Sequence, residues 1–184
     1  MKRVAWLLAA FVTAVFLRLL VGGPGASQSP IAGLVFAACL LVLTAKARPL
    51  ILISWRVLLT GLAGAIVICL PVAVHRLLGI SASHLPFGNF FLWGLVVTIV
   101  ALSEELFLRG SLFDAVTAWR GEATAVIVCA ACFTALHIPL YGWGVVPLDL
   151  AVGTRLGLLR ISSRTAVAPA VAHVAADLAG WWLR

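Results

Sequence analysis

Two adjacent glutamates and an arginine interrupt an apolar stretch of the chain, IVALSEELFLRGSLF, at residues 99–113. Glu105 and Arg109 are four residues apart, so on a helix they share a face and can form an ion pair. Glu104 is turned about 100° from Glu105, and Arg109 reaches it less directly. The spacing therefore predicts one carboxylate neutralised by Arg109 and a second, that of Glu104, left for chemistry. A buried ion pair beside a glutamate without a role is the simpler alternative.

Two histidines and an aspartate also lie in apolar stretches further along the chain. His173 and Asp177 are four residues apart and share a helix face. Glu104 and His137 lie about 14 residues on either side of the turn that joins their helices, so both are about 21 Å from that turn at 1.5 Å per residue. His173, about ten residues into the last helix, lies at a similar level. The spacing predicts that these side chains meet at one depth.

Ionisable residues at such a depth are costly in a chain that crosses a membrane. A carboxylate at the centre of a transmembrane helix costs about 2.5–3.5 kcal/mol on insertion scales, so such groups pair, hydrate and mark functional sites. By this criterion the candidates are Glu104, Glu105, Arg109, His137, Asp149, Arg155, His173 and Asp177.

The elements that must position these residues are predicted to be membrane helices. Of the 184 residues, 64% are hydrophobic and only 10% are charged, against about 25% charged in soluble domains. Apolar stretches of about 18 residues or more, enough to cross a hydrocarbon core of about 30 Å, recur along the chain. We therefore expect an all-α, polytopic transmembrane bundle, a single membrane-embedded domain over 1–184, with an intramembrane cavity. About seven spans are predicted, at residues 4–22, 31–45, 50–73, 89–118, 123–140, 145–160 and 164–183.

The basic residues predict how the bundle is oriented. The net charge of +7 comes mostly from loop residues, which indicates the lipid bilayer as partner and does not indicate nucleic acid. With the N-terminus in the cytoplasm, the basic residues of the cytoplasmic side are Lys2, Arg3, Lys46, Arg48, Arg120, Arg160 and Arg164. The opposite side then has only Arg76 and Arg184. The positive-inside rule favours this orientation, and we expect a multi-pass protein of a prokaryotic inner (plasma) membrane.

The first span has a second interpretation, because MKRVAWLLAAFVTAVF has the basic start and apolar core of a signal peptide. Arg18 interrupts its end and VGGPGASQ is a poor cleavage site, so we expect an uncleaved helix. The cysteines Cys39, Cys69, Cys129 and Cys132 all lie in predicted spans, where they behave as small apolar residues. This position also argues against a redox role for the CAAC sequence.

Three short motifs carry a resemblance to a known family. EELFLRG (EExxxR), FTALH (FxxxH, ending at His137) and HVAAD (His173 to Asp177) occur on three separate predicted helices. In this order they resemble the CAAX protease and bacteriocin-processing (CPBP) family of glutamic-type intramembrane endopeptidases. The resemblance covers residues 90–177, a motif-bearing catalytic core.

The resemblance implies a role for each motif residue. Glu104, helped by His137, would activate a water molecule, while His173 and Asp177 would stabilise the tetrahedral intermediate. Glu105 and Arg109 would brace the helix and tune Glu104. The chain departs from the family at one position, because the last motif usually reads HxxxN and Asp177 replaces the asparagine. Either Asp177 is protonated and donates as an amide would, or it is an anion that orients His173.

A zinc site is the mechanistic alternative, because His137, His173 and a glutamate could form a His₂Glu set. The chain has no HExxH motif, and the resemblance favours a mechanism without metal or other cofactor. The substrate that the resemblance implies is a membrane-associated protein or peptide. We expect cleavage of a leader or of a C-terminal sorting or anchor segment. A prenylated CAAX protein as substrate, a non-catalytic immunity or chaperone-like role and a proton-coupled transporter are the alternatives.

Overall fold

The computed structural model describes residues 1–47, 53–77 and 89–183, and these residues form an all-helical bundle. Seven continuous helices run through this part of the chain, as the sequence predicts, with ends that differ by a few residues. The third was expected from residue 50 and is helical from Trp55, and residues 48–52 lie outside the described ones. The bounds are Lys2–Gly22 (α1), Pro30–Ala47 (α2), Trp55–Leu77 (α3), Phe90–Glu105 (α4), Phe113–Arg120 (α5), Glu122–Tyr141 (α6), Val146–Ser163 (α7) and Val167–Leu183 (α8).

One of these helices contains a change of winding. A π-helical turn, η2 (Leu106–Leu112), joins α4 to α5 without a break, so that Phe90–Arg120 is one 31-residue helix. The side chain of Asn89 caps its start by accepting from the Leu92 N–H at 3.0 Å. The long helix ends at Gly121, whose φ of 87° lies in the region that favours glycine. Because Gly121 alone separates α5 from α6, the two helices form a tight antiparallel hairpin.

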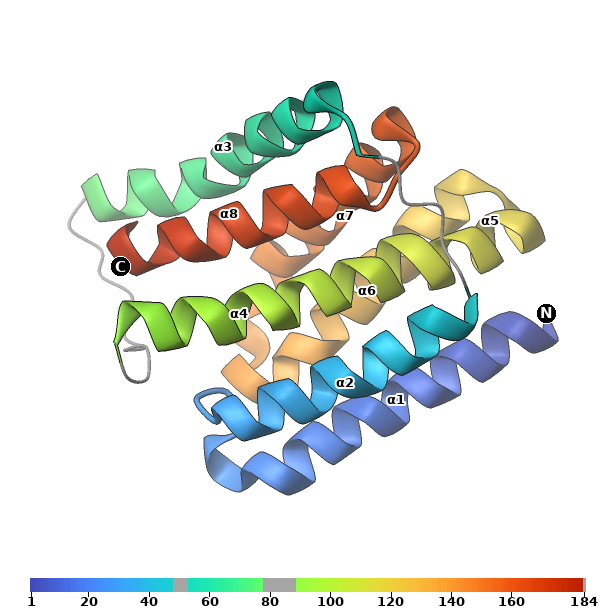
Figure 1. Ribbon diagram of the computed structural model, residues 1–184, viewed down its shortest axis with the longest axis horizontal. Helices are drawn as coiled ribbons and strands as arrows, with labels where there is room; N and C mark the ends of the chain where they lie inside the picture. Colours follow the sequence, from blue (N-terminus) through green and yellow to red (C-terminus); the bar gives the residue numbers. More distant parts are fainter. Residues whose placement is uncertain (48–52, 78–88, 184) are drawn as a thin grey trace.

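The helices are arranged as a layer with a second group behind it. In Figure 1 the order within the layer is α3, α8, α4, α2 and α1, and the contacts between neighbours in this order are extensive. Helices α6 and α7 lie behind this layer and contact each other, and both also contact η2. The glutamate pair at the end of α4 is therefore surrounded by helices on all sides.

The outside of the bundle is apolar, whereas several charged residues are inside. Large apolar side chains such as Phe16, Ile66 and Phe91 are exposed, while Glu105 and Arg109 are fully buried. Four described helices are long and apolar enough to cross a membrane: Lys2–Gly25, Trp55–Val74, Phe90–Arg120 and Glu122–Tyr141. Shorter apolar helices cover Pro30–Ala45 and Val167–Leu183. The chain is thus a polytopic helical membrane protein.

Helix α7 differs from the other six. It forms where the sixth span was predicted, but it is not among the apolar helices just given, and it contains Asp149, Arg155 and Arg160. Its glycines bring it close to α6, because a Cβ at Gly153 would lie 2.9 Å from the Ala130 Cα. Gly153 and Gly157 are four residues apart, a GxxxG spacing that permits this close approach. It also places a backbone carbonyl of α7 against η2.

Candidate active site

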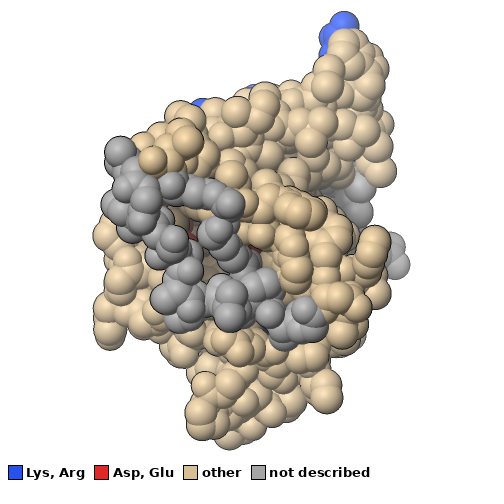
Figure 2. Space-filling model, turned by 90° about the vertical axis from the view of Figure 1, so that its left-hand side faces the viewer, with Lys and Arg blue, Asp and Glu red and all other residues tan. Residues whose placement is uncertain are grey.

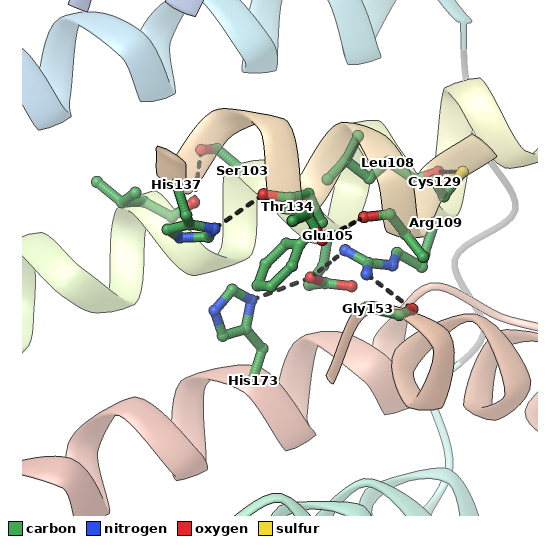
Figure 3. Close-up of polar contacts among 12 residues, drawn as sticks. Ser103, Glu105, Leu108, Arg109, Cys129, Thr134, His137, Gly153 and His173 are labelled. Atoms are coloured by element: carbon green, nitrogen blue, oxygen red, sulfur yellow. Dashed lines mark hydrogen bonds and ion pairs between the residues drawn. The ribbon is translucent and has the colours of Figure 1, made fainter. Parts of the chain in front are cut away.

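The ion pair predicted from the EExxxR spacing is present at the centre of the bundle. Arg109 Nη1 donates to Glu105 Oε1 at 2.8 Å, and both side chains are completely buried. Arg109 Nη2 donates to the carbonyl of Gly153 at 3.1 Å, which links η2 to α7. Figure 3 shows the guanidinium between these two acceptors. Two of its donor groups are thus satisfied by α4 and α7, as a charge removed from water requires.

His173 adds a third helix to this pair. Its Nδ1 lies 3.0 Å from Glu105 Oε1, the same oxygen that accepts from Arg109. Figure 3 shows Glu105 between His173 of α8 and Arg109 of η2. The other ring nitrogen, Nε2, lies 3.5 Å from Asp177 Oδ2, one turn further along α8. Glu105 therefore orients His173 directly, in addition to pairing with Arg109.

The π-helical turn η2 is held by side chains from neighbouring helices. In a π-turn an N–H pairs with the carbonyl five residues earlier, and here the Phe113 N–H reaches Leu108. The Leu108 carbonyl also accepts from the Cys129 thiol of α6 at 3.0 Å. The carbonyl of Arg109 accepts from Arg160 Nε of α7 at 2.8 Å, and Arg160 also binds Asp114. Cys129 thus has a structural contact, and all four cysteines are free.

Glu104 faces a different environment from that of its neighbour Glu105. Its side chain is 2% exposed and lines a cavity of about 460 Å³, whereas Glu105 and Arg109 do not line it. The closest cation is Arg18 of α1, whose Nη1 lies 3.8 Å from Glu104 Oε1. The 100° rotation between adjacent helical residues separates the two glutamates in this way.

The same cavity brings the other predicted residues together. His137 of α6 and both His173 and Asp177 of α8 line it with Glu104 of α4. The four side chains thus come from three helices, at the level that the sequence predicts for them. The cavity lining also includes Arg18 and Asp149.

His137 has one ring nitrogen engaged by the protein backbone. Its Nδ1 lies 2.9 Å from the carbonyl of Phe133 and 3.5 Å from Asp149 Oδ2. Because a carbonyl oxygen only accepts, Nδ1 carries the hydrogen of this bond. In the neutral ring the other nitrogen, Nε2, is then an acceptor. An acceptor of this kind in the cavity wall is suited to receive a proton from water.

The aromatic ring of Phe133 contacts one residue from each of the three motifs. Its centroid lies 4.5 Å from that of His137 and 5.3 Å from that of His173, both in edge-to-face geometry. On the ring the Arg109 guanidinium lies 5.0 Å from the centroid, a cation–π contact. The first residue of the FxxxH motif therefore holds both histidines and Arg109 in position.

Sequence reasoning gave no role to two residues of the cavity. Arg18 was recognised as a charge within the first span, and its Nε and Nη1 have no hydrogen-bond partner in the described part of the chain. Asp149 was a candidate by depth alone. The rule that ionisable groups at membrane depth mark function found Asp149 and, applied to the first span, would have found Arg18 as well. Arg155, the other candidate on α7, is exposed and does not line the cavity.

A metal site is not evident in the same region. Over the residues that the structure describes, no three His, Cys, Asp or Glu side chains form a group that could hold a metal ion. Glu105 and His173 form one contact, and His137 is engaged with Phe133 and Asp149 instead.

Comparison with known proteins yields one match. A family model described as "Type II CAAX prenyl endopeptidase Rce1-like" matches residues 86–179, just over half of the chain. This range contains the residues of all three motifs. Neither the curated proteins nor the solved structures include a match.

The different environments of the two glutamates lead to a prediction about stability. Glu105→Gln leaves Arg109 buried without its counter-charge and should lower the free energy of unfolding by about 3–5 kcal/mol. Glu104→Gln, the same substitution one residue earlier, should cost clearly less, because Arg18 Nη1 is 3.8 Å from the Glu104 carboxylate, beyond hydrogen-bond distance. Unfolding of both variants in detergent measures the difference. Equal losses would contradict the assignment of Glu105 as the structural carboxylate.

Proposed function

The chain belongs to the Type II CAAX prenyl endopeptidase family of Rce1-like proteins, and from this premise we propose that it hydrolyses a peptide bond of a membrane-associated protein with a glutamate-activated water. Membership makes it a membrane protease of the CAAX type. The observation that carries the proposed mechanism is the lining of one cavity by Glu104, His137, His173 and Asp177, from three helices.

Water activation is assigned to Glu104 and His137. Glu104 is the only one of the two adjacent glutamates on the cavity wall, and Nε2 of His137 is an acceptor in the neutral ring. In the proposed step the carboxylate of Glu104 takes a proton from water while the water oxygen attacks the peptide carbonyl carbon. The proton then passes to the leaving nitrogen as the C–N bond breaks, so that the products are a carboxylic acid and an amine.

Stabilisation of the tetrahedral intermediate is assigned to the α8 pair. In the proposed arrangement His173 is an imidazolium: its Nδ1–H donates to Glu105, and its Nε2–H, 3.5 Å from Asp177 on the cavity wall, is the donor to the intermediate. A donor held in place before the reaction stabilises the developing negative charge without reorganisation. Arg18, whose Nε and Nη1 have no acceptor among the described residues, is a further donor close to Glu104. Glu105 and Arg109 do not line the cavity, so they act as positioning residues.

The proposed substrate is a leader or a C-terminal sorting or anchor segment of a membrane-associated protein. A prenylated CAAX protein is the second candidate, because the description of the family names that activity. The proposed location is a plasma membrane with the N-terminus in the cytoplasm, on the basis of the basic residues.

The first prediction from the proposed function concerns catalysis. Glu104→Gln, His137→Ala and His173→Ala should each lower processing by at least about 10²-fold, because each removes a general base or an oxyanion donor. The measurement is a comparison of protein termini in membranes of cells that produce the wild type or one variant. Ser162→Ala, at an exposed position outside the cavity, is the control. A wild-type set of termini with Glu104→Gln would exclude the proposed mechanism and support a non-catalytic role.

The second prediction concerns metal. Activity of the purified protein in detergent should survive prolonged treatment with a strong chelator, because carboxylate and imidazole groups alone activate the water. Loss of activity on chelation, with recovery when zinc is added, would instead establish the His₂Glu alternative.

The third prediction separates the two roles of Asp177. If Asp177 is a protonated donor, Asp177→Asn should keep much of the activity, because the amide supplies the same hydrogen bond. Asp177→Ala removes the donor and should lower the rate by about 10²–10³-fold. The hydrolysis rates of the two folded variants distinguish the two roles of Asp177. An Asn variant as inactive as the Ala variant would show that Asp177 acts as an anion on His173.

A further inference from the structure

The cavity extends from the middle of the bundle to one end only. On α4, its lining residues end at Glu104 and include none from η2 or α5. On α6 and α8 the lining comes from the C-terminal parts of the helices, starting at Phe133 and His173. On α7 it comes from the first half, ending at Val152. The residues at mid-depth therefore form the floor of the cavity.

The mouth lies where the lining reaches the connections between helices. Ser27, Gln28 and Ser29 line it between α1 and α2, and Tyr141 and Val145 line it between α6 and α7. In Figure 1 the connection between α1 and α2 and the C-terminal end of α8 lie at the end of the bundle away from the N-terminus. Figure 2 looks onto this end, where parts of acidic residues are visible behind atoms nearer the viewer.

The basic residues gather at the other end. Lys2 and Arg3 begin α1, Arg120 ends α5, and Arg164 follows α7. Figure 1 shows the start of α1 and the end of α5 together, opposite the mouth, and basic atoms appear only at the edge of Figure 2. Lys46 and Arg48 belong to the same end by sequence, although Arg48 and the side chain of Lys46 are outside the described residues.

The mouth end has few basic residues. The two connections that line it, GGPGASQSP and GWGVVP, contain no Lys or Arg, and only Arg76 and Arg184 belong to this end by sequence. The side chains of both are outside the described residues. Lys and Arg close to the ends of spans are retained in the cytoplasm. The basic end of the bundle therefore favours the cytoplasmic side of the membrane, and the mouth end favours the opposite side.

We propose that the cavity opens to the extracytoplasmic face, and that the substrate is a peptide segment already translocated across the membrane. This inference rests on the proposed function and narrows it. The fitting substrate is the membrane-proximal, extracytoplasmic segment of an anchored protein, and the water that is consumed enters from the outer aqueous phase. A prenylated protein made and retained in the cytoplasm would meet the closed end of the bundle.

The chemistry of the lining agrees with such a segment. The mouth offers uncharged hydrogen-bonding groups, those of Ser27, Gln28 and Tyr141, whereas Glu104, Arg18 and His173 lie deeper. An extended peptide can bond through its backbone at the mouth, and it passes Asp149 and Asp177 before it reaches Glu104 at the floor. Apolar residues such as Val96 and Val100 cover the wall between them.

Cysteine accessibility tests the orientation without any need for activity. Gln28→Cys at the mouth and Arg164→Cys at the basic end are each treated with a membrane-impermeant maleimide in intact spheroplasts and after permeabilisation. Neither residue is one of the proposed catalytic groups, and the wild type gives the background from its four native cysteines. The expected result is full labelling of Gln28→Cys in intact spheroplasts and labelling of Arg164→Cys only after permeabilisation. The reverse pattern would overturn the proposal.

The termini found in membranes provide a second, separate measurement. New termini that depend on Glu104 should lie in extracytoplasmic segments of membrane-anchored proteins. Glu104-dependent termini confined to cytoplasmic segments would overturn the inference while leaving the proposed protease function in place. If the labelling is as expected but no terminus depends on Glu104, the orientation stands and the proposed function fails.

Discussion

The ion pair between Glu105 and Arg109 is the interaction on which the arrangement of the bundle depends. Removing two charges from water costs several kcal/mol for each ion, and the attraction between them offsets this only when their remaining groups are also bonded. Here the further contacts come from the Gly153 carbonyl, from His173 and from the ring of Phe133, while Arg109 Nε and Glu105 Oε2 have no hydrogen-bond partner among the described residues. Helices α6, α7 and α8 are therefore each bound to the same buried charge pair.

The need to bond the buried ion pair explains features of the fold that have no role in the proposed catalysis. The glycines of α7 allow its backbone to approach α6, so that a carbonyl reaches Arg109. The π-turn lies over the same residues, and its carbonyls accept from Cys129 and Arg160. The apolar exterior and the polar interior follow from what surrounds each of them. Lipid offers no partner to a charged side chain, so only neighbouring helices can supply one.

The parts that follow from local spacing could be predicted, and those that depend on distant contacts could not. Helix positions came from the length of the apolar stretches, and the pairing of Glu105 with Arg109 came from a separation of four residues. The bond from Glu105 to His173 joins residues 68 apart, and the contact of Arg18 with Glu104 joins α1 to α4. No local pattern encodes either contact. The π-turn was also missed, because its apolar residues fit an ordinary helix equally well.

The single-residue connection at Gly121 has a consequence for how the length of this chain can vary. It joins the helix that carries both glutamates to the helix that carries Phe133 and His137, with no loop that could absorb a change. One inserted residue between Arg109 and Phe133 would rotate the following residues by about 100° and shift them by about 1.5 Å. It would thereby turn the ring of Phe133 away from Arg109. Evolution or design can therefore lengthen the chain elsewhere far more easily than within this hairpin.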